Sequence, residues 1–350
     1  MRYQPRVMPG LPFPTDSDLG ELPARALVAD IGGTNARFAM ADVDTLALSD
    51  IRRFQCSEQP DIGSAAFEYV RSLKERPRYA AIAVAAPVVG EEVKLTNSPW
   101  RFVKSELCAA AGVDGLLVMN DFHALALSLP HLQGGDLSRI GGGKAPRLAT
   151  KAVLGPGTGI GVAGLLWGGL GWTAISGEGG HITLPVQSPE ELALVERLRA
   201  GRERVSVERA LSGPGLSDLY LAVAEGKGRS VEPLIPNDVL ERGIEGSDEI
   251  AVETLSIFVT WLGRFGGDIA LLFGARGGVY LGGGIAPKIR ALLSAGAFRA
   301  AFEDKGRMRG YLEPVPVYVI LAPDAALRGA AAGLRAGLER GGGALVMPSS

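Results

Sequence analysis

Two segments of this chain carry the same glycine-turn pattern, each between two runs of mainly apolar residues. IGGTNARFA, around Gly33-Thr34, aligns with GPGTGIGVA, around Gly157-Thr158, which lies 124 residues later (157 − 33). Each segment predicts a β-hairpin with a glycine turn, over residues 25–42 and 151–167. A hairpin repeated at the spacing of a whole domain indicates two related halves.

The other predicted elements are a mixture of strands and helices. Strands are expected at 52–57, 80–89, 92–96, 115–119, 278–281 and 316–321. Helices are expected at 62–75, 104–111, 122–129, 190–200, 207–211, 216–225, 250–272 and 324–338. This mixture predicts an α/β fold with two lobes, and such folds bind ligands at the ends of their strands.

Composition excludes several classes of protein. The net charge of −2 gives no field that would attract nucleic acid or an anionic membrane. Cys56 and Cys108 are too few for a disulfide framework or a cysteine-rich zinc site, as expected in a reducing compartment. Residues 1–21 lack the apolar core of a signal peptide and are expected to be a flexible extension.

One uncharged stretch, residues 152–177, has the length of a membrane-spanning helix. It contains nine glycines and Pro156, however, and a spanning helix needs about twenty mainly apolar residues in a row. A buried strand-turn-strand is the better prediction. Glycine makes up 49 of the 350 residues, twice the usual share of roughly 7%, which indicates tight turns where the backbone approaches a ligand.

The two glycine turns suit a polyphosphate. Asp30 ends a buried strand beside Gly32-Gly33, so backbone amides can contact phosphate oxygens while the carboxylate faces a Mg²⁺ shell. Residues 155–161 offer a second set of amides together with Thr158. Either turn alone is more often a structural hairpin; the alignment of two turns favours phosphate binding.

Two other phosphate-binding patterns fail on their context. Residues 159–164 match the dinucleotide pattern GxGxxG, but a strand follows where a helix should begin. Gly143-Lys144 resembles the end of a P-loop, but Ala145 stands where serine or threonine is required.

Three polar groups are candidates for chemistry on a hydroxyl. Asp121, in Asn120-Asp121 at the end of a strand, is either a general base or the cap of the following helix. Glu178 and His181 lie on a glycine-rich bend, where they can bind sugar hydroxyls but make a weak metal site. His123 and His131 have no such setting and are expected to be structural. Glu208 is either the N3 member of a local cap or a third sugar ligand. Its spacing in the sequence does not distinguish these two roles.

Taken in order, these motifs resemble the bacterial glucokinase family, within the hexokinase, actin and heat-shock ATPase superfamily. The segments that carry the resemblance are LVADIGGTNARFA, TNSPW, NDFHALA, LGPGTGIGV, SGEGGHI, SVERALSGPGL and LGGGIAP. The resemblance covers nearly the whole chain, from about residue 25 to residue 338. No cysteine follows Cys108, so the zinc motif of the related repressor-type sugar kinases is absent from this sequence.

The resemblance implies a role for each matching residue. Asp121 is the implied catalytic base, and Asp30 the residue that contacts Mg²⁺ through water. The implied glucose ligands are Asn120, Asp121, Glu178, His181 and Glu208. The implied ATP ligands are Asp30, Gly32, Gly33, Thr34, Asn35, Gly155, Gly157, Thr158, Gly159, Gly283 and Gly284.

The resemblance also implies a fold and an activity. The implied fold is the two-lobed actin-like ATPase (ribonuclease H-like) fold with an interlobe cleft. Its small domain would comprise residues 22–132 and 322–350, and its large domain residues 133–321. The implied activity is transfer of the γ-phosphate of Mg·ATP to the 6-hydroxyl of glucose, in the cytoplasm, without nucleic acid or membrane as a partner. Dimers are common in the family, so a homodimer is one expectation.

Three alternatives stay open at this stage. One is a kinase for another hexose, such as mannose or fructose, because the sequence does not say which epimers are accepted. The second is an actin-like or chaperone-like ATPase, which would share the phosphate turns but would lack the Asn-Asp, Glu-x-x-His and Glu set. A sugar-sensing regulator would need a DNA-binding segment, for which the stretch before residue 25 is too short.

Overall fold

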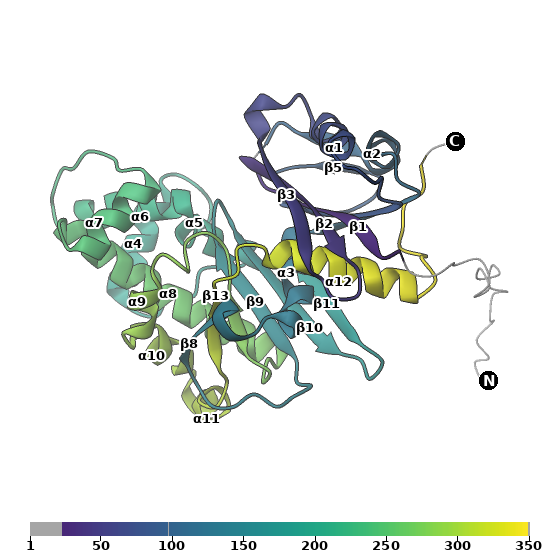
Figure 1. Ribbon diagram of the computed structural model, residues 1–350. Coiled ribbons are helices and arrows are strands. Elements are labelled where there is room, and N and C mark those ends of the chain that lie inside the picture. Colours follow the sequence, from purple (N-terminus) through teal and green to yellow (C-terminus); the bar gives the residue numbers. More distant parts are fainter. Residues whose placement is uncertain (1–22, 97, 349–350) are drawn as a thin grey trace, which may run out of the picture. The chain divides into compact units, whose positions relative to one another are not determined.

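The computed structural model describes residues 23–96 and 98–348 (Figure 1). The expected N-terminal extension, residues 1–21, lies outside the described residues, as does Asn97 of the TNSPW motif. Contacts between residues divide the chain into two compact units. The first unit runs to Asp121 and resumes at Ala330, and the second comprises Phe122–Gly329.

The first unit is built on a five-stranded mixed sheet with the strand order β3-β2-β1-β4-β7. Its strands are β1 (Arg25–Ile31), β2 (Asn35–Asp42), β3 (Leu48–Gln55), β4 (Tyr79–Val84) and β7 (Gly115–Asn120). The first three form an antiparallel meander, and β4 and β7 continue the sheet parallel to β1. The predicted hairpin over residues 25–42 is confirmed. Strands β1 and β4 are inner strands and nearly fully buried, which explains their apolar sequences.

Short elements cover this sheet. They are η1 (Cys56–Glu58), α1 (Ile62–Arg71), β5 (Glu92–Lys94), β6 (Arg101–Val103) and α2 (Lys104–Ala111). Helix α1 begins where the Asp61 carboxylate accepts a hydrogen bond from the Ser64 backbone N–H, 2.7 Å away. It ends four residues before the predicted position, because residues 74–76 are charged and exposed and offer no apolar face to bury.

The second unit contains a six-stranded sheet with the order β11-β10-β9-β12-β13-β8. Its strands are β8 (Leu137–Gly141), β9 (Lys151–Pro156), β10 (Ile160–Trp167), β11 (Trp172–Gly177), β12 (Val279–Leu281) and β13 (Val317–Ile320). Strands β9 to β11 form an antiparallel meander, and β12 and β13 run parallel to β9. Five strands therefore repeat the order and directions of the first sheet, which confirms the prediction of two related halves. Strand β8 is an additional edge strand that the sequence analysis did not predict.

Most helices belong to the second unit, and the first and last of them continue into the first unit. They are α3 (Asp121–Ser128), α4 (Pro189–Arg199), α5 (Val207–Ala210), α6 (Gly213–Gly226), α7 (Pro236–Glu245), α8 (Glu249–Phe273), α9 (Arg290–Ser294), α10 (Ala297–Glu303), α11 (Arg309–Leu312) and α12 (Ala325–Glu339). Four short 3₁₀ turns lie between them: η2 (Leu129–His131), η3 (Gly134–Asp136), η4 (Gly179–His181) and η5 (Gly306–Met308).

Helix α8 is at the centre of the second unit's core. Its Phe258, Trp261 and Phe265 side chains are fully buried. It is long and apolar enough to cross a membrane, but 67% of its most apolar 18-residue window is buried inside the protein. Such burial is typical of a core helix in a globular protein.

The boundary between the two units differs from the expected one. We expected residues 122–132 and 322–329 in the smaller domain, but contacts place both in the second unit. Leu125 and Leu129 share a buried cluster with Val153 and Ala163 of the second sheet. The reason is packing: α3 follows a strand of the first sheet in sequence but buries its apolar side chains against the second.

Candidate active site

The first glycine turn lies between β1 and β2. Asp30 of β1 is directly opposite Arg37 of β2, and the carboxylate accepts a hydrogen bond from the Arg37 guanidinium. The Gly32 backbone N–H closes the turn on the Asn35 carbonyl oxygen, 2.9 Å away. The Asp30 side chain is 15% exposed, so its carboxylate is within reach of a ligand. Arg37 was not predicted as a site residue, although the register of the predicted hairpin places it opposite Asp30.

This turn is also held by Cys56, the first residue of η1, directly after β3. The Cys56 backbone N–H donates to the Thr34 carbonyl oxygen at 2.8 Å, and its thiol donates to the Gly32 carbonyl oxygen at 3.6 Å. The Thr34 side chain remains exposed. The turn is thus fixed by its carbonyl groups, which leaves Thr34 exposed.

Asn120 and Asp121 lie at the same edge of the first sheet as this turn. Ile31 pairs with Val84 in the parallel β1–β4 ladder, and Val84 pairs with Asn120 in the β4–β7 ladder. Two strand spacings, about 10 Å, therefore separate the end of β1 from the end of β7. The Asn120 side-chain amide donates to the Ala86 carbonyl oxygen at 3.2 Å, and Asp121 is the first residue of α3.

The second glycine turn lies between β9 and β10, with Gly155 opposite Gly161. The Gly157 backbone N–H donates to the Gly159 carbonyl oxygen at 2.7 Å. A Cβ on Gly155 would lie 2.4 Å from the backbone of Gly282. The turn therefore packs backbone against backbone on the residues that follow β12.

Those residues include Gly283 and Gly284, two of the ATP ligands that the family resemblance implies. Gly283 has φ of +75°, and a Cβ there would lie 2.4 Å from the Pro156 carbonyl oxygen. The Ile285 backbone N–H donates to that same oxygen at 3.2 Å. The structure thus brings together the two segments predicted to bind the nucleotide in the second unit, and only glycine permits so close an approach.

Glu178 and His181 lie at the glycine-rich bend after β11. Their side chains are 60% and 59% exposed, and the carboxylate Oε2 lies 4.0 Å from the imidazole Nε2. Between them, Gly180 is buried against β10, where a Cβ would lie 2.4 Å from the Ile160 carbonyl oxygen. The bend is fixed through its backbone, which leaves both polar side chains at the surface.

Glu208 lies between this bend and the second turn. Its Oε2 accepts a hydrogen bond from the Ile160 backbone N–H at 3.0 Å. Ser206 caps α5 by accepting from the Arg209 N–H, so Arg209 and not Glu208 holds the N3 position. The local-cap alternative for Glu208 is therefore wrong. The second unit brings Glu178, His181 and Glu208 close to the second glycine turn, whereas Asn120 and Asp121 belong to the first unit.

Two residues that the sequence analysis did not assign to the site directly follow Asp121. The His123 ring Nδ1 lies 2.8 Å from the Ser176 hydroxyl, two residues before Glu178. Burial lowers the pKa of His123. A Cβ on Gly161 would overlap the Phe122 ring, at 1.9 Å. In the sequence, only the NDFH motif pointed to Phe122 and His123, and the motif does not show which strands these residues contact.

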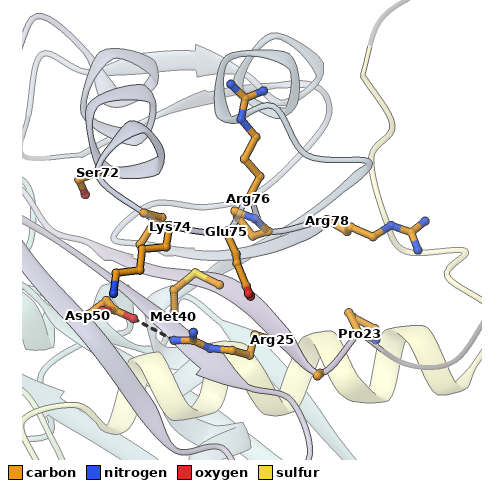
Figure 2. Close-up of a pocket in the computed structure, with 12 residues that line it drawn as sticks. Pro23, Arg25, Met40, Asp50, Ser72, Lys74, Glu75, Arg76 and Arg78 are labelled. Atoms are coloured by element: carbon orange, nitrogen blue, oxygen red, sulfur yellow. Dashed lines mark hydrogen bonds and ion pairs between the residues drawn. The ribbon is translucent and has the colours of Figure 1, made fainter.

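A cavity of about 700 Å³ lies elsewhere in the first unit (Figure 2). Its lining includes Arg25, the first residue of β1, at the opposite end of that strand from the glycine turn. The Arg25 guanidinium pairs with Asp50 at 2.8 Å, and Lys74 points toward the same carboxylate (Figure 2). Its described lining contains none of the predicted site residues, so we do not place the active site there.

A Mg²⁺ ion at a nucleotide site requires few protein ligands. In the described part of the chain, no group of three or more Asp, Glu, His or Cys residues could hold a metal ion. Mg²⁺ at nucleotide sites is bound by one or two carboxylates, phosphate oxygens and water. Asp30 at the first glycine turn fits that requirement as a single carboxylate.

Comparisons with known proteins agree with the motifs. A family model described as Glucokinase matches residues 27–336. The glucokinase of Tolumonas auensis is 40% identical over 311 residues, which cover 89% of this chain and 97% of that protein. The crystal structure of a glucokinase from an Antarctic psychrotroph has a TM-score of 0.80 at 36% identity, covering 90% of this chain and 100% of the other. A ROK family glucokinase from Streptomyces griseus, in complex with glucose and AMPPNP, shares the fold with a TM-score of 0.60 at 21% identity, covering 88% and 98% of the two chains.

Proposed function

Because this chain belongs to the glucokinase family, we propose that it transfers the γ-phosphoryl group of ATP to the 6-hydroxyl of D-glucose. The products are ADP and glucose 6-phosphate, as in the first step of glucose catabolism. The family match supports this activity over that of a non-kinase ATPase.

The position of Glu208 is the observation that carries the proposal. Its carboxylate bonds to the Ile160 backbone directly after the second glycine turn. The adjacent Val207 N–H donates to the Ile182 carbonyl oxygen at 2.9 Å, at the end of the Glu178–His181 bend. Candidate sugar ligands and a candidate phosphate turn are therefore neighbours within one unit, and phosphoryl transfer depends on such proximity.

The proposed roles follow the predicted residues. Glucose would be bound by Asn120, Asp121, Glu178, His181 and Glu208. The ATP phosphates would contact the two glycine turns, and the adenosine would contact Gly283 and Gly284. Asp30 would hold Mg²⁺ through water, and the ion would neutralise charge on the phosphate oxygens. AMPPNP in a solved structure of the same fold supports ATP as the donor.

Asp121 is the proposed catalytic base. As the 6-hydroxyl oxygen forms its bond to the γ-phosphorus, the hydroxyl proton passes to the Asp121 carboxylate and the bond to the ADP oxygen breaks. The polar side chains would select among sugar epimers, because an unpaired buried polar group costs about 1–3 kcal/mol.

Replacing Asp121 tests this mechanism. Asp121→Asn should lower kcat at least about 100-fold, the usual contribution of general base catalysis, while glucose binding measured by calorimetry is largely retained. Asp114→Asn is a matched control, because Asp114 is an exposed acid of the same unit that pairs with Arg78. Near-normal turnover in Asp121→Asn would remove Asp121 from the mechanism.

A panel of hexoses tests the substrate. ADP release from Mg·ATP should depend on glucose and should accompany formation of glucose 6-phosphate. Faster turnover with mannose or fructose would identify a kinase for another hexose. ADP release that is indifferent to every sugar would reject the kinase proposal in favour of an ATPase.

We also propose that the enzyme acts in the cytoplasm and forms a homodimer, with neither nucleic acid nor a membrane as a partner. The two cysteines are free and buried, which supports a reducing compartment. The homodimer rests on the family resemblance alone.

A further inference from the structure

A single stretch of chain, residues 206–213, contacts both parts of the second unit's proposed site. It begins at Ser206, the N-cap of α5, and ends at Gly213, the first residue of α6. The proposed function assigns the bend on one side of it to the sugar and the turn on the other side to the nucleotide. We call residues 206–213 the connecting segment.

The connecting segment contacts the nucleotide turn first through Glu208. The Glu208 Oε2 accepts the Ile160 backbone N–H at 3.0 Å. The same carboxylate lies against Gly159, where a Cβ would be 2.3 Å from Oε2. This carboxylate therefore packs directly on the end of the turn.

A second contact reaches the other end of the same turn. The Gly213 backbone N–H donates to the Gly157 carbonyl oxygen at 2.7 Å. Both ends of the turn are thus hydrogen-bonded to one short piece of chain, so a shift of that piece changes the position of the turn.

The connecting segment is also joined to the sugar-binding bend. Thr183 and Ser206 form an isolated antiparallel bridge, and the Val207 N–H donates to the Ile182 carbonyl oxygen at 2.9 Å. The bend ends at His181, one residue before Ile182. Hydrogen bonds therefore join the connecting segment to the bend through Val207 and to the turn through the next residue, Glu208.

We infer that Glu208 is a positioning residue that couples sugar binding to the conformation of the nucleotide turn. A carboxylate has two oxygen atoms: Oε2 holds the Ile160 N–H, and Oε1 is the oxygen that would accept a sugar hydroxyl. A sugar that fixes this carboxylate also fixes the turn, which raises the affinity for nucleotide. By linkage, nucleotide must raise the affinity for sugar by the same factor. This inference rests on the proposed function and adds to it a coupling between sugar binding and nucleotide binding.

The test is calorimetric measurement of the glucose Kd with and without saturating Mg·AMPPNP. In the unaltered protein we expect the nucleotide analogue to lower the glucose Kd about fivefold or more, the range of typical coupling energies. Glu208→Ala, which removes both oxygens, should bring this ratio close to one. Glu208→Gln keeps an acceptor oxygen for the Ile160 N–H and should retain part of the coupling.

Gly159→Ala provides an independent variant. The added methyl group meets the flexible end of the Glu208 side chain, so the carboxylate moves and the fold is retained. We expect weaker glucose binding in the absence of nucleotide and a ratio close to one, although position 159 belongs to the nucleotide turn.

Ser206→Ala is the matched control. It removes the cap of α5, in which the Ser206 hydroxyl accepts the Arg209 N–H at 3.3 Å, and leaves the Glu208 carboxylate in place. If Ser206→Ala loses as much coupling as Glu208→Ala, general loosening of the connecting segment explains the effect and the inference is wrong. A ratio near one in the unaltered protein would also reject it. Absence of glucose-dependent turnover would instead reject the proposed function, so the two failures are distinguishable.

Discussion

At the scale of single residues, His123 connects the helix that begins at Asp121 with the strand that leads to Glu178. Its Nδ1 lies 2.8 Å from the Ser176 hydroxyl, and burial lowers its pKa from the ordinary value of 6.5. Burial therefore favours the neutral imidazole. Since Ser176 is two residues before Glu178, this hydrogen bond fixes the strand end from which the sugar-binding bend starts.

Removal of this hydrogen bond should affect the binding of sugar. We expect His123→Ala to raise the KM for glucose about 2- to 10-fold, as the loss of one neutral hydrogen bond predicts, with a smaller effect on kcat. His123→Asn can place a polar atom where Nδ1 lies and should largely restore the KM. Steady-state kinetics on both variants decides, and an unchanged KM in His123→Ala would show that the contact has no role in positioning.

At the scale of elements, α4 is attached to the core helix α8 by a buried ion pair. Ser188 and Glu191 form a capping box at the start of α4. The Glu191 carboxylate also accepts hydrogen bonds from Arg264, at 2.9 Å, and from the indole of Trp261, at 3.0 Å. Burial by itself would raise the pKa of Glu191, but the hydrogen bonds from Arg264, the Gln187 backbone and Trp261 outweigh it and lower the pKa.

Glu191→Gln should therefore destabilise the protein. It leaves the Arg264 guanidinium buried without its counter-charge, and breaking one side of a buried pair costs about 3–5 kcal/mol. Urea denaturation measures the loss. Glu196→Gln is the control on the same helix, because Glu196 forms an exposed pair with Arg199 and should cause no measurable change.

The same pair predicts the effect of pH. Because the folded protein lowers the pKa of Glu191, its contribution is fully present above the ordinary value of 4.5 and is lost as pH falls through the folded-state pKa. Glu191→Gln should consequently lose less stability than the unaltered protein on acidification below pH 4.5. Equal acid sensitivity in both proteins would contradict this assignment.

At the scale of the whole molecule, the two large sheets share a five-strand topology, and each has its own buried core. Together with the likeness to solved glucokinases, these sheets confirm the predicted α/β actin-like ATPase fold. Because the two cores are separate, we expect unfolding in more than one transition. A ligand that binds only the folded protein nevertheless stabilises it by mass action.

Glucose should therefore protect the folded protein. At a concentration 100 times its Kd, we expect about 2.7 kcal/mol of stabilisation and a higher midpoint in a thermal scan. Glu178→Gln should need more glucose for the same shift, because its side chain is a proposed sugar ligand. A midpoint that is independent of glucose at millimolar concentrations would contradict tight sugar binding.

The sequence by itself determined the features that depend on local order. Glycine turns between apolar runs predicted both hairpins, and their alignment predicted the repeated half, because strand alternation and turn chemistry act over a few residues. The ordered motifs also identified the family. Short elements such as β8 and α9–α11 were missed, since each is too short for a periodic apolar pattern to stand out. Helix α7 was also missed, although its Val239, Leu240 and Gly243 form a buried face at helical spacing.

Only the tertiary structure decided which distant residues meet. Glu208 and Ile160 are 48 positions apart, and Glu191 and Arg264 are 73 apart, so no local pattern pairs them. Likewise α3 follows the first sheet in sequence yet packs in the second unit's core. Such contacts depend on how whole elements bury their apolar faces, which is a property of the packed chain and not of any short segment of it.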